Sequence, residues 1–148
     1  MTAQEMWELF AKEQNIAETE YDAWAFGDDA DTLAELVKQG IKTGTASAYP
    51  LYEIDGEPLP EASGYSVILN SKEEAACIIE NTKVYVVPFC EVSAEHAYKE
   101  GEGDRSLEYW RKVHEKFFTG CMEEAGLTFD ENMKVVCEEF RVVYRPKV

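Results

Sequence analysis

The stretch Gly40-Ile41-Lys42-Thr43-Gly44-Thr45 holds a lysine and a threonine beside two glycines. The glycine spacing and the order of lysine and threonine differ from those of a phosphate-binding Walker A loop. Lys42 and Thr45 are three positions apart, so on a regular strand they would face opposite sides. A bend or bulge at Gly44 would let them converge. The alternative is an ordinary strand that begins after a helix capped by glycine, and the spacing alone leaves both interpretations open.

A second candidate group begins with three carboxylates on a glycine-rich segment and continues into the next predicted helix. It consists of Glu100, Glu102, Asp104, Arg111 and His114. An arginine beside an aromatic stripe needs an acceptor, which one of the three carboxylates could supply. The alternatives are helix N-terminal electrostatics for the acidic residues and a core position for the histidine. Carboxylates could also hold Mg²⁺ or Mn²⁺. However, the two histidines and four cysteines show no ligand spacing, so we expect no resident metal.

Hydrophobic spacing and turn residues predict the elements that must position these groups. A first helix is predicted over about residues 2–14, with Thr2 as its cap. A second is expected to start from the caps in residues 27–31 and to end at Gly40. Residues 16–26 are interpreted as an aromatic connection and residues 55–58 as a tight turn in a polar loop. Strands are predicted over residues 65–70, 75–80, 83–89 and 134–144, and further helices over residues 93–99 and 106–124. This pattern favours an α+β fold.

The composition narrows the class of protein. The chain has 148 residues, is 45% hydrophobic and 30% charged, and carries a formal net charge of −16. These values fit one soluble globular domain over residues 1–148. The charge opposes non-specific nucleic-acid binding, which needs several basic residues on one face. No apolar run approaches the roughly 20 residues of a membrane span. The N-terminus lacks the features of an export signal, so we expect a cytoplasmic protein with reduced thiols and no membrane partner.

The chain resembles the ASCH domain family, and in particular a bacterial subgroup of about this length. The pattern Gly40-x-Lys42-x-x-Thr45 is similar to the family signature. The run from Glu100 through Glu102, Asp104, Trp110 and Arg111 to His114 and Phe118 resembles the subgroup. So do Tyr21-x-x-Trp24-x-Phe26-Gly27 and Cys137-Glu138-x-Phe140-x-Val142-Val143-Tyr144. The resemblance covers about residues 21–146.

The resemblance implies a PUA-like fold, a small mixed β-barrel with flanking helices, and a ligand cleft below the Gly-x-Lys motif. Two activities are associated with the family: amide hydrolysis of N4-acetylcytidine and metal-stimulated cleavage of RNA. Lys42, Thr45 and Glu100 match the hydrolase's lysine, threonine and glutamate, with Glu102 as an alternative register for the acid. We expect the ligand-binding residues to be Trp24, Tyr49, Glu102, Asp104, Arg111 and His114.

The sequence supports three hypotheses of different classes. The first is a cleft that binds a nucleoside, a nucleotide or an RNA base and that hydrolyses a modified pyrimidine nucleoside. The second is an RNA-binding module or ribonuclease, and the third is a non-catalytic protein-interaction domain. An ordinary lysine, with a pKa near 10.4, is neutral in about one molecule of 2,500 at pH 7. General-base catalysis therefore requires a deeply buried Lys42, whereas a charged Lys42 would instead bind a phosphate or polarise a base carbonyl.

Overall fold

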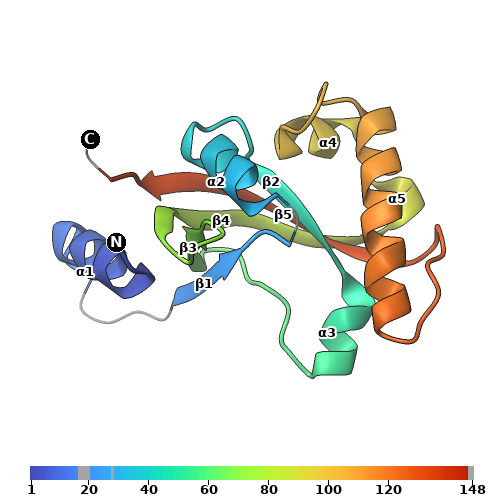
Figure 1. Cartoon of the computed structure of the whole chain (residues 1–148), viewed down its shortest axis with the longest axis horizontal. Coiled ribbons are helices and arrows are strands. Elements are labelled where there is room, and N and C mark those ends of the chain that lie inside the picture. Colours follow the sequence, from blue (N-terminus) through green and yellow to red (C-terminus); the bar gives the residue numbers. More distant parts are fainter. Residues whose placement is uncertain (17–20, 28, 147–148) are drawn as a thin grey trace. The chain divides into compact units, whose positions relative to one another are not determined.

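The computed structural model describes residues 1–16, 21–27 and 29–146. Helices are interspersed with strands along this part of the chain (Figure 1). In chain order the elements are α1 (Ala3–Gln14), β1 (Tyr21–Ala25), α2 (Ala30–Lys38), β2 (Gly44–Ala48), α3 (Tyr49–Asp55), β3 (Tyr65–Leu69), β4 (Ala75–Pro88), the 3₁₀ turn η1 (Phe89–Glu91), α4 (Ala94–Glu100), α5 (Leu107–Glu124) and β5 (Lys134–Tyr144).

The five strands form one mixed sheet in the order β1-β3-β4-β5-β2. β1 pairs parallel to β3, whereas β3 with β4 and β2 with β5 pair antiparallel. The chain divides into two compact units. Unit 1 is Met1–Thr43, Glu61–Lys83 and Phe140–Val148, and unit 2 is Gly44–Pro60 and Val84–Glu139. The long strands β4 and β5 each contribute residues to both.

In unit 1, α1 covers one apolar cluster of the sheet. The helix starts at Thr2, whose hydroxyl accepts the Glu5 backbone N–H while the Glu5 carboxylate accepts that of Thr2, as in a capping box. Met6, Trp7 and Phe10 of this helix are buried against β3 and β4, so they form its apolar face. This helix is fixed by its cap and its apolar stripe together.

The second helix of unit 1 delivers the chain to Lys42. Ala34 and Val37 pack on a cluster that includes Ile68 of β3. The helix ends before Gly40, which has a φ of +80° that favours glycine. The backbone N–H of Lys42 then donates to the Leu36 carbonyl at 3.1 Å, which closes the turn. Asp28, one of the predicted caps, lies outside the described residues.

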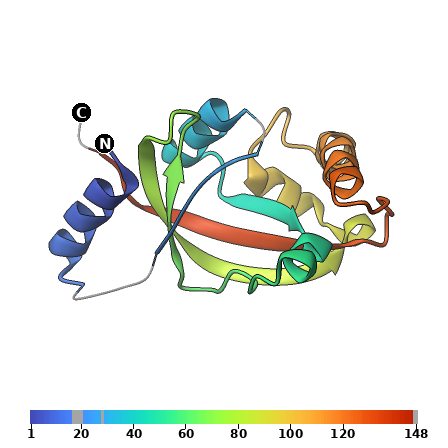
Figure 2. The same ribbon diagram turned by 60° about the horizontal axis from the view of Figure 1, so that its bottom comes forward.

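In unit 2, β2 lies beside the first half of β5 (Figure 2). Ala46 and Ala48 of β2 face an apolar core that also contains Val135 and Cys137 of β5. Helices α4 and α5 close this core with Ala97, Trp110, Phe118 and Met122. Both helices begin as predicted, because Ser93 and Ser106 accept backbone N–H groups at their N-caps.

Three sequence predictions on the elements were wrong. The aromatic segment before α2 forms an edge strand, β1, for its described residues. The two strands predicted over residues 75–80 and 83–89 are one strand, β4, that passes through the polar residues between them. The segment before the turn at Gly56 is the helix α3, which starts with Pro50 in its first turn and ends at this glycine.

The described helices are all too short or too polar to cross a lipid bilayer. The four cysteines are free thiols, and those of Cys77 and Cys137 are buried.

Candidate functional site

Helix α4 places Glu100 in the interior of unit 2. His96, Ala97 and Glu100 lie at the i, i+1 and i+4 positions of one buried face. Gly101 follows with a φ of +70°, so the helix ends directly after the acid. The Glu100 side chain is only 1% exposed. A buried carboxylate is costly unless hydrogen-bond donors replace its water, so the surroundings of Glu100 must supply them.

Two nitrogen atoms approach the same oxygen of Glu100. The indole Nε1 of Trp110 donates to Oε2 at 2.6 Å, and Nε2 of His96 lies 2.8 Å from this atom. A carboxylate only accepts, so the His96 proton is on Nε2 in this contact. Hydrogen bonds to an ionised acceptor are short and strong, and these two fix the orientation of the Glu100 carboxyl group.

Gly44 leaves the room that the His96 ring occupies. A Cβ at this position would lie 3.4 Å from His96 Cε1 and 3.2 Å from the Glu138 carbonyl oxygen. The pairing of β2 with β5 is regular from Gly44 onwards, so this ladder has no bulge at the glycine. The absence of a side chain at Gly44 allows α4 to approach β2 closely. The His96 Nδ1 atom is buried and makes no hydrogen bond with any described residue.

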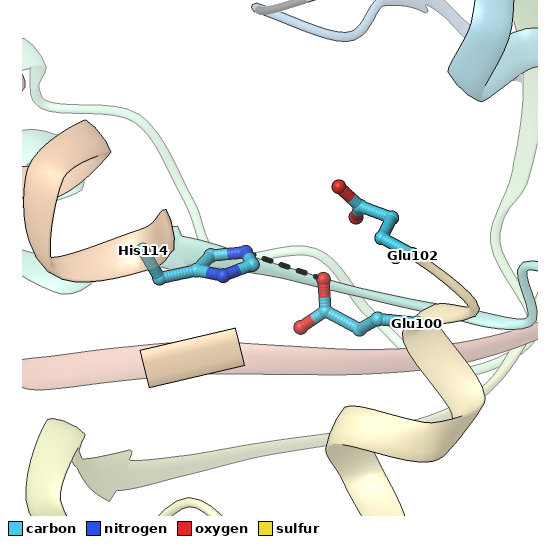
Figure 3. A group of neighbouring side chains, drawn as sticks. All are labelled: Glu100, Glu102 and His114. Atoms are coloured by element: carbon cyan, nitrogen blue, oxygen red, sulfur yellow. Dashed lines mark ion pairs between the residues drawn. The ribbon is translucent and has the colours of Figure 1, made fainter. Parts of the chain in front are cut away.

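The third nitrogen at Glu100 belongs to His114, one turn after Trp110 on α5. Its Nε2 lies 3.4 Å from Oε1 of Glu100, and its Nδ1 lies 2.9 Å from the Trp110 carbonyl oxygen. The ring stacks on Trp110, with centroids 4.2 Å apart and planes 14° apart. Glu102 completes a group in which the potential ligand atoms of all three residues lie within 4.8 Å of one another (Figure 3). We call Glu100, Glu102 and His114 the acid–imidazole group.

Thr45 belongs to a second polar group of unit 2. It pairs across the ladder with Glu138, which is 8% exposed. Side chains alternate along a strand, and Ala46 faces the apolar core. Thr45 and Ser47, on either side of it, therefore face the opposite side of the sheet, where the Glu138 side chain also lies. The Ser47 and Tyr52 hydroxyls are 2.8 Å apart. Burial raises the pKa of Tyr52, and the Glu138 charge acts in the same direction. We call Thr45, Ser47, Tyr52 and Glu138 the hydroxyl face.

Lys42 lies in unit 1, three residues before Thr45 in the chain. Its side chain is 1% exposed, and Nζ lies 5.2 Å from the centroid of the Phe26 ring. Cations are attracted to the face of an aromatic ring, so Phe26 is a favourable neighbour for the ammonium group. The burial that the hydrolase hypothesis requires of Lys42 is therefore present.

Two residues of the second candidate group from the sequence, Asp104 and Arg111, make other contacts than those of the acid–imidazole group. The exposed Asp104 side chain accepts the Ser106 backbone N–H at 2.9 Å, and hydrogen bonds from Ser106 lower the pKa of Asp104. Arg111 donates from Nη2 to the Cys90 carbonyl at 3.0 Å instead of to the expected carboxylates. Asp104 thus shapes the turn before α5, and Arg111 ties α5 to the 3₁₀ turn η1.

The two aromatic candidates belong to different units. Trp24 lies on β1 of unit 1 and meets Phe26 edge to face, with centroids 4.9 Å apart. Tyr49 is the first residue of α3 in unit 2, and Nζ of Lys134 lies 5.4 Å from its ring centroid. Both are half-buried, so each keeps part of its ring accessible.

Three residues that shape these groups were not assigned a role from the sequence. They are His96, Trp110 and Glu138. A signal existed for two contacts, because His96 and Glu100, like Trp110 and His114, are four residues apart on a helix and must share a face. Glu138 was visible as a carboxylate within an apolar strand, which is costly unless it is used or paired.

Comparison with known proteins identifies the family. The model of the ASCH domain family matches residues 22–144. An ASCH domain structure from Lactobacillus crispatus JV V101 is 34% identical with a TM-score of 0.90, covering 96% of this chain and 94% of that one. A structure from Enterococcus faecalis V583 is 33% identical with a TM-score of 0.89, covering 96% and 88%. ASCH from Zymomonas mobilis, at 11% identity and a TM-score of 0.51, shares the fold over 82% of this chain and 65% of its own.

No curated protein matches the sequence. The family match spans most of the chain, and the two bacterial structures share both the fold and a third of the residues. The α+β class and the PUA-like fold expected from the sequence are confirmed with it. The chain therefore belongs to the ASCH domain family.

Proposed function

We propose that this chain binds a nucleoside or nucleotide and hydrolyses the acyl amide of a modified pyrimidine nucleoside such as N4-acetylcytidine. The observation that carries the proposal is the Glu100 carboxylate, which is buried and held by Trp110 and His96. A charged group fixed in the interior costs stability, and such groups are concentrated at sites of binding and catalysis. In an ASCH domain with the Lys42–Thr45 motif, this carboxylate is the acid that the hydrolase pattern requires.

In the proposed reaction the Thr45 hydroxyl oxygen attacks the carbonyl carbon of the acetyl group. Lys42 takes the hydroxyl proton and returns it to the departing amino group, so the nucleoside leaves and an acetyl ester of Thr45 remains. Water then cleaves the ester, with Lys42 again accepting a proton, and acetate is released. In the hydrolase pattern a glutamate orients these groups, and the proposal gives this role to Glu100. The half-buried rings of Trp24 and Tyr49 supply surfaces on which a base can stack.

The charge of the chain favours a small ligand over a polynucleotide. A net charge of −16 repels RNA at long range, whereas a nucleoside carries no phosphate. Among the outer residues Glu102 and His114 offer one acceptor and one imidazole, which match the amino and carbonyl edges of a pyrimidine. The experiment described next also gives the results that would favour the RNA-binding or the protein-interaction hypothesis.

The test is turnover of N4-acetylcytidine, followed as release of cytidine and acetate by chromatography. Three replacements of nearly unchanged shape remove the proposed chemistry: Lys42→Met, Thr45→Val and Glu100→Gln. Thr119→Val is the matched control, because this hydroxyl donates only to the Glu115 carbonyl within α5. We expect release by the wild-type chain and by the control, with a loss of at least 100-fold in each of the three variants.

Two results would overturn the proposal in different ways. Release that persists in Thr45→Val would exclude the threonine as nucleophile. No release by the wild-type chain would exclude the hydrolysis, and a rise in melting temperature with the nucleoside would then leave a recognition site. RNA binding that weakens with salt and with Lys42→Met would favour the RNA module instead.

A further inference from the structure

The acid–imidazole group has the donor set and the surroundings of a metal centre. We propose that His114, Glu100 and Glu102 bind one divalent transition-metal ion of the zinc or manganese class. The inference goes beyond the proposed hydrolysis and does not rest on it. Because Glu100, Glu102 and His114 are common to both proposals, the metal is tested by binding, without substrate.

The hydrogen bond at Nδ1 of His114 determines which ring nitrogen carries the proton. Its Nδ1 lies 2.9 Å from the Trp110 carbonyl oxygen, which can only accept, so the ring proton is on Nδ1. In the neutral ring Nε2 then carries a lone pair, and this atom faces Oε1 of Glu100 at 3.4 Å. A ring-nitrogen lone pair and a carboxylate oxygen that converge in this way have the arrangement of two protein ligands of one metal ion.

The distance between the two atoms fits the metal. Zinc–nitrogen and zinc–carboxylate bonds of about 2.1 Å at a tetrahedral angle place two ligand atoms about 3.4 Å apart. The observed separation is 3.4 Å. A direct ion pair between imidazolium and carboxylate would close to about 2.8 Å, as His96 and Glu100 do at the other oxygen. The gap at His114 therefore has the width of a pair of metal ligands.

The hydrogen bonds that hold His114 and Glu100 in place are also those of a metal centre. A metal-binding histidine usually donates its second N–H to a carbonyl or carboxylate, which fixes the ring, and the Trp110 carbonyl has this role for His114. A ligating carboxylate is in turn held by hydrogen bonds. Trp110 and His96 hold Oε2 of Glu100, so Oε1 remains directed at His114. Trp110 thus orients both residues, His114 through its carbonyl oxygen and Glu100 through its indole N–H.

Glu102 supplies the third ligand. It is half-buried, and an oxygen of its carboxylate lies within 4.8 Å of the other two ligand atoms. Two carboxylates and one imidazole suit zinc, manganese or iron, because calcium and magnesium prefer oxygen alone. Three protein ligands leave a coordination position open for water or a substrate oxygen.

The experiment titrates chain that has been stripped with a chelator. A Cys90→Ser background removes the exposed thiol, which would otherwise bind zinc. Zinc affinity is measured by competition with a chromophoric chelator, and Mn²⁺ is measured by electron paramagnetic resonance. We expect one ion per chain and at least a tenfold loss of affinity in Glu102→Gln, a half-exposed position where the fold tolerates the change. Asp104→Asn is the matched control, since this exposed carboxylate lies on the same loop, and it should bind as the parent does.

The nitrogen chemical shifts of His114 give a second measurement that needs no variant. With zinc bound, Nδ1 keeps its proton and Nε2 shifts as a metal ligand. Two results would overturn the proposal: no stoichiometric ion, with an Nε2 signal that zinc does not move, or binding that Glu102→Gln leaves unchanged.

Discussion

The hydrogen bond between Trp110 and Glu100 gives a prediction whose size follows from the structure. Trp110→Phe removes the Nε1–H that donates to Oε2 at 2.6 Å but keeps an aromatic ring against Phe89 and His114. Loss of a hydrogen bond to a charged group costs about 1.5–3 kcal/mol. The smaller ring leaves a void of roughly 40 Å³, which adds about 1 kcal/mol. We therefore expect the free energy of unfolding to fall by about 2.5–4 kcal/mol.

Trp7→Phe separates the hydrogen bond from the change of size. Trp7 is also buried among aromatic rings, and in the described part of the chain it packs by its ring alone. Its replacement should cost only the void, about 1 kcal/mol. The difference between the two variants therefore isolates the bond to Glu100.

The free energies come from urea unfolding followed by circular dichroism, because the substitutions alter tryptophan fluorescence. A difference below about 0.5 kcal/mol between Trp110→Phe and Trp7→Phe would be less than any hydrogen bond to a charged acceptor. That result would refute the reasoning that Trp110 holds the Glu100 carboxylate. It would also remove one of the hydrogen bonds on which the metal proposal depends.

Three further predictions concern other parts of the chain. Gly44→Ala forces a Cβ against α4 and should lower stability by about 1–3 kcal/mol in urea unfolding, whereas Gly120→Ala, with no atom near its Cβ, should not. Hydrogen bonds lower the pKa of Asp31 below its ordinary 3.8, so its contribution is present above that pH and is lost in acid. The stability difference between wild type and Asp31→Asn should accordingly be seen at pH 7 and vanish as the pH falls well below 3.8, and a difference that persists there would contradict it. Burial raises the pKa of Cys77 to about 12, so in native protein at pH 8 a thiol reagent should modify the exposed Cys90 and leave Cys77 intact.

The elements that were predicted correctly from the sequence contain residues that mark their ends. Thr2, Ser93 and Ser106 cap their helices, and the last strand has the predicted bounds. The helix α3 was missed because none of its residues is buried and no side chain caps it. The strand β4 was divided because residues 80–83 are polar, yet pairing with β3 continues through Glu80. Sheet pairing is a long-range interaction, and local composition does not report it.

The site was predictable where chemistry and spacing coincide. Glu100, Glu102 and His114 were named from the sequence and lie together. Asp104 was named with them, but its exposed side chain accepts from Ser106 two residues later, a local contact that competes with any distant one. The partner of Thr45 was beyond prediction, because Glu138 reaches it only through the register of β2 with β5.

The junction between β2 and α3 has a consequence for altering the length of the chain. Ala48 ends the strand and Tyr49 begins the helix, with no residue between them. One inserted residue would turn α3 by about 100° about its axis, which would carry Tyr52 away from Ser47. Residues 57–62 lie outside any helix or strand and are mostly exposed, so added chain there disturbs little of the fold. A peptide tag or a reporter domain therefore belongs in that loop, and natural variation in length should accumulate there before it reaches the hydroxyl face.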